Sequence, residues 1–80
     1  MKVSLNGILS TAADGASEID LTAGTIRELL QKLEERYPRM APHVKDGIAV
    51  AINGQIFRDS WNQPIPEDAE VYLLPRIAGG

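Results

Sequence analysis

The chain has 80 residues, 44% hydrophobic and 24% charged, as expected for one small globular domain, and without cysteine it can form no disulfide, thiolate nucleophile or cysteine-ligated metal site. Eight basic residues are scattered among eleven acidic ones, and the resulting net charge of −3 argues against a nucleic-acid-binding protein. Since no apolar stretch approaches the ~20 residues of a membrane helix and no signal-peptide pattern is visible, we expect a cytoplasmic protein without a membrane-bound part.

The first quarter of the chain predicts two strands. Residues 2–9 alternate apolar and polar side chains, as in a half-buried strand, until Gly7 interrupts the pattern. Residues 10–15 are small and end in Asp-Gly, which indicates a turn. Residues 17–21 form a second short strand, so a hairpin is expected here.

The next segment carries the clearest helical pattern in the chain. Thr25 and Glu28 have the spacing of a capping box, in which the Thr25 hydroxyl accepts from the Glu28 backbone N–H and the Glu28 side chain reaches back. Pro38 should end the helix. One apolar stripe follows the helical period and predicts the face that packs on a sheet: Ile26, Leu29, Leu30, Leu33 and Tyr37.

The second half of the chain predicts three more strands. Residues 39–47 read as an irregular connection, and residues 48–52 read as a strand in a central position because they are continuously apolar. Asn53-Gly54 is a strong hairpin signal, followed by a fourth strand at residues 55–57. After a loop that contains Trp61, residues 70–74 form the last strand.

This order of elements predicts an α+β protein with the β-grasp arrangement, a mixed sheet of four to five strands with one main helix packed on one face. Residues 1–74 should form this domain, and residues 75–80 should form a projecting tail. Pro75 is expected to end the sheet pairing because it lacks a backbone N–H. Gly79 and Gly80 have no Cβ, so they present a terminal carboxylate on the thinnest possible backbone.

Length, element order and tail together resemble the MoaD/ThiS family of sulfur carrier proteins and, more distantly, ubiquitin. The resemblance extends over essentially the whole chain and rests on residues 51–54, residues 66–71 and the ending Ile77-Ala78-Gly79-Gly80. It implies that the chemistry belongs to the carboxylate of Gly80. Arg76 departs from the molybdopterin branch of the family, which usually has a second proline there.

By this resemblance, a partner of the ubiquitin-activating type would adenylate Gly80 with ATP and Mg²⁺, and a sulfur donor would convert it to a thiocarboxylate. The chain itself has no phosphate-binding glycine loop, so no cofactor or metal is expected on it. The tail residues are each expected to have a role toward the partner: Gly79 allows close approach, Ala78 keeps the chain thin, and Ile77 offers an apolar anchor. Arg76 either contacts an acidic groove or is simply solvated.

A docking surface beside the tail is expected on the last strand. Val71 and Leu73 share one face of this strand and Tyr72 and Leu74 share the other, so one pair should meet the helix and the other should face outward. We expect Tyr72 and Leu74, together with Phe57, to form an apolar patch for a partner. Trp61 reads as an edge packing residue, and His43, the only histidine, reads as a turn or surface residue.

Several functions stay open at this point. The first is a sulfur carrier acting as the small subunit of a molybdopterin synthase, with thiazole or cysteine synthesis as alternative destinations of the sulfur. The second is a ubiquitin-like modifier joined to lysine side chains through Gly80. The third is an interaction module with an inert tail. An enzyme acting alone is the least expected, because no set of acid, base and nucleophile is visible.

Overall fold

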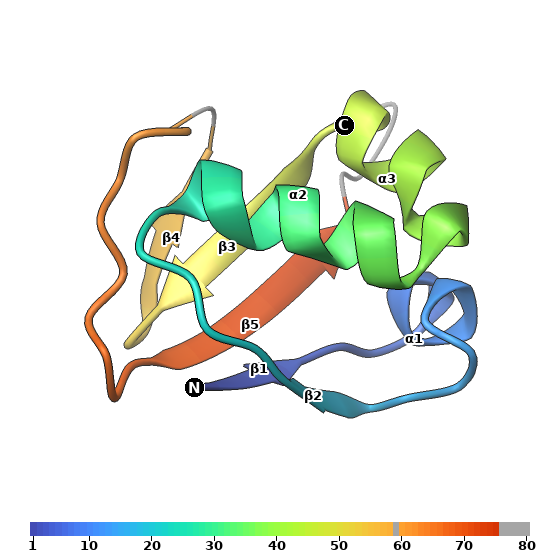
Figure 1. The fold of residues 1–80 in the computed structure, drawn as a ribbon, viewed down its shortest axis with the longest axis horizontal. Coiled ribbons are helices and arrows are strands. Elements are labelled where there is room, and N and C mark those ends of the chain that lie inside the picture. Colours follow the sequence, from blue (N-terminus) through green and yellow to red (C-terminus); the bar gives the residue numbers. More distant parts are fainter. Residues whose placement is uncertain (59, 76–80) are drawn as a thin grey trace.

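A computed structural model describes residues 1–58 and 60–75 of the chain, and Figure 1 shows their arrangement. The elements follow one another as β1 (Lys2–Ser4), α1 (Ile8–Ala12), β2 (Glu18–Asp20), α2 (Ile26–Arg36), the 3₁₀ helix η1 (Pro38–Met40), α3 (Ala41–Asp46), β3 (Ile48–Ile52), β4 (Gln55–Phe57) and β5 (Glu70–Pro75).

The five strands form one mixed sheet in the order β2-β1-β5-β3-β4. The last strand therefore lies in the middle, parallel to β1 and antiparallel to β3. The two outer pairs, β1 with β2 and β3 with β4, are antiparallel. A mixed sheet with a helix across one face is the β-grasp architecture, so the predicted fold class is confirmed.

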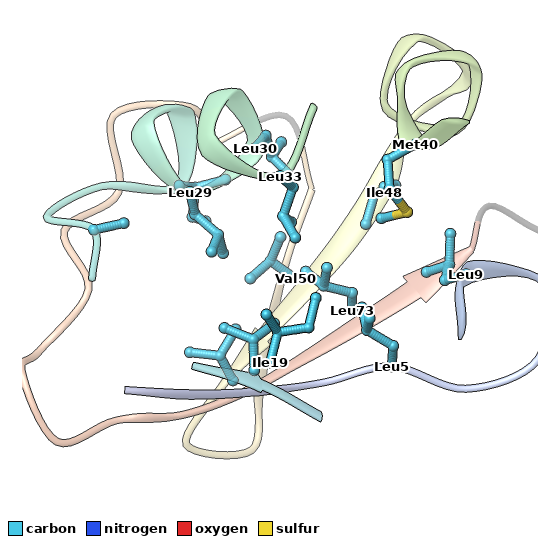
Figure 2. Close-up of a cluster of buried hydrophobic side chains, with 14 of the residues drawn as sticks. Leu5, Leu9, Ile19, Leu29, Leu30, Leu33, Met40, Ile48, Val50 and Leu73 are labelled. Atoms are coloured by element: carbon cyan, nitrogen blue, oxygen red, sulfur yellow. The ribbon is translucent and has the colours of Figure 1, made fainter. Parts of the chain in front are cut away.

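Helix α2 covers one face of the sheet, as its apolar stripe predicts (Figure 1). Its buried leucines point toward Val50 of β3 and Leu73 of β5, each 1% exposed (Figure 2). A second part of the same cluster contains Leu9 and Met40, both fully buried, with Ile48 at the start of β3. This second part packs the core at the end of the sheet where β5 finishes.

Two segments expected to be irregular are helical. Residues 10–15 were predicted as a turn, but α1 occupies Ile8–Ala12 and buries Leu9 and Ala12. Residues 39–47 were predicted as an irregular connection, but they contain most of η1 and all of α3. Pro42 does not break α3 because it stands in the first turn, where a proline leaves no helical hydrogen bond unmade.

Three backbone donors at the start of α2 that have no partner within the helix are bound by other groups. Thr25 caps the helix and accepts from the Glu28 N–H at 3.2 Å. The Ile26 and Arg27 N–H groups donate to carbonyls of the loop after β4, those of Gln63 and Trp61. The Leu29 N–H then donates to the Thr25 carbonyl as the first bond of the helical ladder, so the N–H groups of Ile26, Arg27 and Glu28 are not open to a bound anion. The Glu28 carboxylate lies 3.3 Å from the Lys32 ammonium, which is its observed partner in place of the predicted reach-back.

The turn between β3 and β4 also anchors β5. Asn53 and Gly54 both have positive φ, 50° and 87°, as a two-residue hairpin turn requires. The Asn53 side-chain oxygen accepts from the Glu70 N–H at 2.9 Å, and the Asn53 N–H donates to the Glu70 carbonyl. One asparagine therefore sets the hairpin and holds the first residue of the central strand.

Replacing Asn53 separates these two roles. Asn53→Gly keeps the positive φ but removes the side-chain acceptor, so we expect a loss of about 1 kcal/mol of folding free energy. Asn53→Ala adds the cost of a left-handed backbone, about 1–2 kcal/mol more. Urea denaturation measures both, with Asn53→Asp, which keeps the acceptor, as control. Equal stability of the glycine and wild-type proteins would contradict the role of the Glu70 bond.

Candidate functional site

The side chains of β5 alternate between the core and the uncovered face of the sheet. Val71 and Leu73 are each 1% exposed and pack under α2, whereas Tyr72 is 52% exposed on the other side. Leu74 shares the side of Tyr72 and is half-buried. The predicted assignment of the two faces is therefore confirmed.

Strand register extends this exposed face beyond β5. Tyr72 lies opposite Ala51 of β3, and Ala51 lies opposite Ile56 of β4. Leu74 lies opposite Ala49 in the next row. Residues directly opposite one another share a face, so these five side chains form one apolar surface, here called the outer-face patch: Ala49, Ala51, Ile56, Tyr72 and Leu74.

The prediction that Phe57 belongs to this patch is wrong. Phe57 lies opposite Val50, whose side chain is in the core, and Phe57 itself packs against the core cluster. Its neighbour Ile56 is the residue that faces outward, with 52% of its surface exposed. The two-residue turn at Asn53-Gly54 fixes this register, so counting outward from the turn pairs Val50 with Phe57 and identifies Ile56.

Charged side chains occupy the rest of the outer face, over β1, β2 and the start of β5. Lys2 and Glu18 form an ion pair of 3.7 Å, and the Asp20 side chain is 93% exposed. Glu70 is also exposed and lies opposite Lys2. Three carboxylates lie here against two cations, Lys2 and the N-terminal ammonium, which is 3.4 Å from Asp20, so the outer-face patch has a charged, slightly acidic border on one side.

Strand β5 continues one residue further than predicted. Pro75 was expected to end the pairing, but it lies opposite Ile48 at the end of the β3 ladder. A proline is compatible with this position because β1, the neighbour on its other side, ended at Ser4, opposite Tyr72. Arg76, Ile77, Ala78, Gly79 and Gly80, all predicted to serve a partner's channel, lie outside the described residues.

Two other residues considered in the sequence, His43 and Trp61, lie outside the strands of the sheet. His43 lies in α3 and is half-buried, in a short helix where a turn was expected. Trp61 is 37% exposed in the loop after β4, and its carbonyl accepts from the Arg27 N–H of α2.

In residues 1–58 and 60–75, no three acidic or histidine side chains are grouped as metal ligands. No helix of this part is long and apolar enough to cross a membrane.

Comparison with known proteins identifies the family to which this chain belongs. The family model for ThiS proteins matches residues 3–80, nearly the whole chain. The chain belongs to the ThiS family. No curated protein matches the sequence.

Solved structures of ThiS-like proteins share the fold. CysO in the BexX/CysO complex of Amycolatopsis orientalis superposes with a TM-score of 0.78 at 25% identity, covering 99% of this chain and 98% of that one. Small archaeal modifier protein 1 (SAMP1) from Methanosarcina acetivorans has a TM-score of 0.79 at 25% identity, covering 99% and 94%. A Pyrococcus furiosus protein assigned as subunit 1 of a molybdopterin converting factor, 22% identical over 95% of both chains, shares the fold with a TM-score of 0.72. The chain is a small carrier or modifier protein of the ThiS and MoaD type.

Proposed function

We propose that this ThiS-family chain is a sulfur carrier whose reactive group is the carboxyl group of Gly80. Its carboxylate oxygen attacks the α-phosphate of ATP on an activating enzyme, which gives the Gly80 acyl-adenylate and releases pyrophosphate. A donor at the sulfide level then delivers HS⁻ to the acyl carbon and AMP leaves with the bonding electrons, so the product is a thiocarboxylate. This chain supplies the carboxylate and the docking surface, and the partner supplies ATP, Mg²⁺ and the catalytic groups.

The single observation that carries this proposal is the match of the ThiS family model through residue 80, which includes both terminal glycines. The structure supports it in one further way. An apolar outer-face patch runs along β5 to Leu74, directly before the tail, so a partner that binds the patch is in position to receive the tail. The complex of the neighbour CysO with another protein, BexX, supports a protein partner for this chain.

We place the sulfur in molybdopterin synthesis, with the large subunit of the synthase as acceptor. The fold shared with the Pyrococcus furiosus converting-factor subunit agrees with this destination. Thiazole or cysteine synthesis would use the same thiocarboxylate. The likeness to SAMP1, a modifier protein, favours a second role in which Gly80 is joined to a lysine side chain of a target.

The test is intact-mass analysis of the chain after incubation with ATP, Mg²⁺, a ThiS-type activating enzyme and a sulfur source. The proposal expects a mass gain equal to one oxygen replaced by sulfur, located at Gly80 by fragmentation. Conjugates with a Gly80–lysine isopeptide bond would instead support the modifier role. A native protein that continues beyond Gly80 and is not trimmed back would contradict both.

Tyr72 should contribute to partner binding more than to folding. Removing its exposed ring by Tyr72→Ala takes the one aromatic side chain from the patch, so the activating enzyme's KM should rise about tenfold or more. Trp61→Ala removes another exposed aromatic ring away from β5 and serves as the control. Steady-state adenylation kinetics measure both. An unchanged KM for Tyr72→Ala would contradict the patch as a docking surface.

A further inference from the structure

The two edges of the sheet differ in how they are protected. At the β2 edge, the Asp20 carbonyl accepts from Arg36 of α2 at 3.2 Å, and Lys32 donates to the Thr22 carbonyl nearby. Glu18 and Asp20 also place charges along this edge. Charged side chains and covered carbonyls are the usual protection against pairing with another strand.

The β4 edge has none of this protection. Its residues are Gln55, Ile56 and Phe57, without a charge or a proline, and isoleucine and phenylalanine favour extended backbone. The following loop does not cover it by hydrogen bonding, since the Trp61 and Gln63 carbonyls accept from α2. No hydrogen bond joins the described residues of that loop, 60–66, to Ile56. Within residues 1–58 and 60–75, the backbone of Ile56 therefore has no hydrogen-bonding partner at this edge and is available to another strand.

The strand register shows which backbone N–H and C=O groups of β4 point away from β3. Gln55 lies opposite Ile52 next to the two-residue turn, the position of a hydrogen-bonded pair, so Ile56 opposite Ala51 is the non-bonded pair that follows. The N–H and C=O of Ile56 consequently point away from β3. Its side chain is 52% exposed on the outer face.

We propose that β4 pairs with β4 of a second copy of this chain, antiparallel, about a two-fold axis at Ile56. The Ile56 N–H of each copy then donates to the Ile56 carbonyl of the other. Gln55 of one copy lies opposite Phe57 of the other on the helix side. The result is one continuous sheet through both copies, with the outer-face patches side by side.

A second copy fits this edge because the edge is complementary to itself. A two-fold axis brings each residue opposite its mirror position in β4, and this segment contains no charge that would meet a like charge there. The exposed Ile56 side chains lie directly opposite each other on the outer face. The row Tyr72–Ala51–Ile56 of one copy then continues into the same row of the other, which covers apolar surface that a single copy exposes.

The contact is short, so the pairing should be weak and depend on concentration. Each copy contributes a strand of three residues, which places the interface at the small end of specific interfaces. We expect dimers to dominate near roughly 1 mM protein and monomers near roughly 10 µM.

Hydrogen exchange at single amides tests the pairing. The Ile56 amide should exchange rapidly in dilute protein and at least about tenfold more slowly in concentrated protein, because only the dimer gives it an acceptor. The Glu18 amide is the matched control, since it also points outward, from the β2 edge, and should not change with concentration. Sedimentation equilibrium over the same range gives the association itself. A monomer at every concentration, or equal behaviour of the two amides, would overturn the proposal.

Charged substitutions at Ile56 distinguish pairing with a second copy of the chain from binding of a different partner at this edge. Ile56→Lys and Ile56→Glu each place like charges opposite one another at the two-fold axis, so each variant alone should stay monomeric. Their equimolar mixture should form the mixed dimer, because a lysine then lies opposite a glutamate. Failure of the mixture to associate while wild type dimerises would place the contact elsewhere and overturn the β4 pairing. These readouts do not involve Gly80, so they stand or fall independently of the carrier chemistry.

Discussion

Replacing Gly79 by valine should abolish adenylation of the chain and leave its stability unchanged. A β-branched side chain next to the reacting residue widens the backbone where it must enter the partner's active site and restricts its dihedral angles. Displacement of a reacting group by about 1 Å costs roughly 100-fold in rate, so we expect at least that loss. Single-turnover formation of the Gly80 adenylate measures it, with thermal unfolding measured in parallel.

Gly24→Val is the matched control for this experiment. Gly24 is exposed in the segment before α2, and a Cβ built there meets no atom within 4 Å, so valine is tolerated. The control should adenylate like the wild-type chain. Normal turnover of Gly79→Val would show that the partner does not enclose the tail and would contradict the channel that the carrier proposal requires.

The Leu73→Ala variant should lose most of the stability of the domain. Leu73 is 1% exposed in the central strand and packs beneath α2, so the truncation leaves a cavity that the surrounding residues cannot fill (Figure 2). Such substitutions cost about 2–5 kcal/mol, and in a domain of this size each kcal/mol lowers Tm by about 4–8 °C. We therefore expect a fall in Tm of roughly 10–30 °C by calorimetry or circular dichroism.

Tyr72→Ala on the same strand is its control. The adjacent side chain is half exposed on the outer face, so its removal should change the free energy of unfolding by about 1 kcal/mol or less, well below the loss in Leu73→Ala. The pair tests the alternation of β5 directly. If Tyr72→Ala destabilised the protein as much as Leu73→Ala, the outer face would be covered and could not serve as an open docking surface.

The helix stripe and the Asn53-Gly54 turn were among the parts of the fold that could be predicted from sequence. Both depend on local rules that the rest of the chain reinforces, since α2 has a full apolar face to bury and the turn requires positive φ at two positions. The turn contained more information than the strand pattern alone. Its fixed register assigns Val50 and Phe57 to one face, and counting residues from it would have placed Ile56 in the patch.

The short helices could not be predicted from periodicity. Helix α1 has five residues, and its buried positions include Ala12, a side chain too small to mark an apolar stripe. Helix α3 begins with a proline in its first turn, which reads as a breaker unless the helix start is already known. Both helices are held by tertiary packing, through Leu9 of α1 and through Met40 just before α3.

The candidate site, like the fold, could be predicted only in part. The alternation of Tyr72 and Leu74 with buried neighbours could be predicted from the strand pattern, because period-two burial is a property of one segment. The composition of the patch could not, because Ala49, Ala51 and Ile56 join it through pairing between strands distant in sequence. Outward side chains on three strands make a surface only when the order of those strands is known.

The central place of β5 has a consequence for how the protein is made. The β1–β2 pair and the β3–β4 pair have no direct contact within the sheet, and β5 is the element that joins them. While residues 70–75 are still inside the ribosome, the two strand pairs cannot join into one sheet. Helix α2 then has no complete sheet to pack on. Folding of the domain has to wait until residues 70–75 have left the ribosome, and truncation before Glu70 should leave a species that chaperones and proteases recognise.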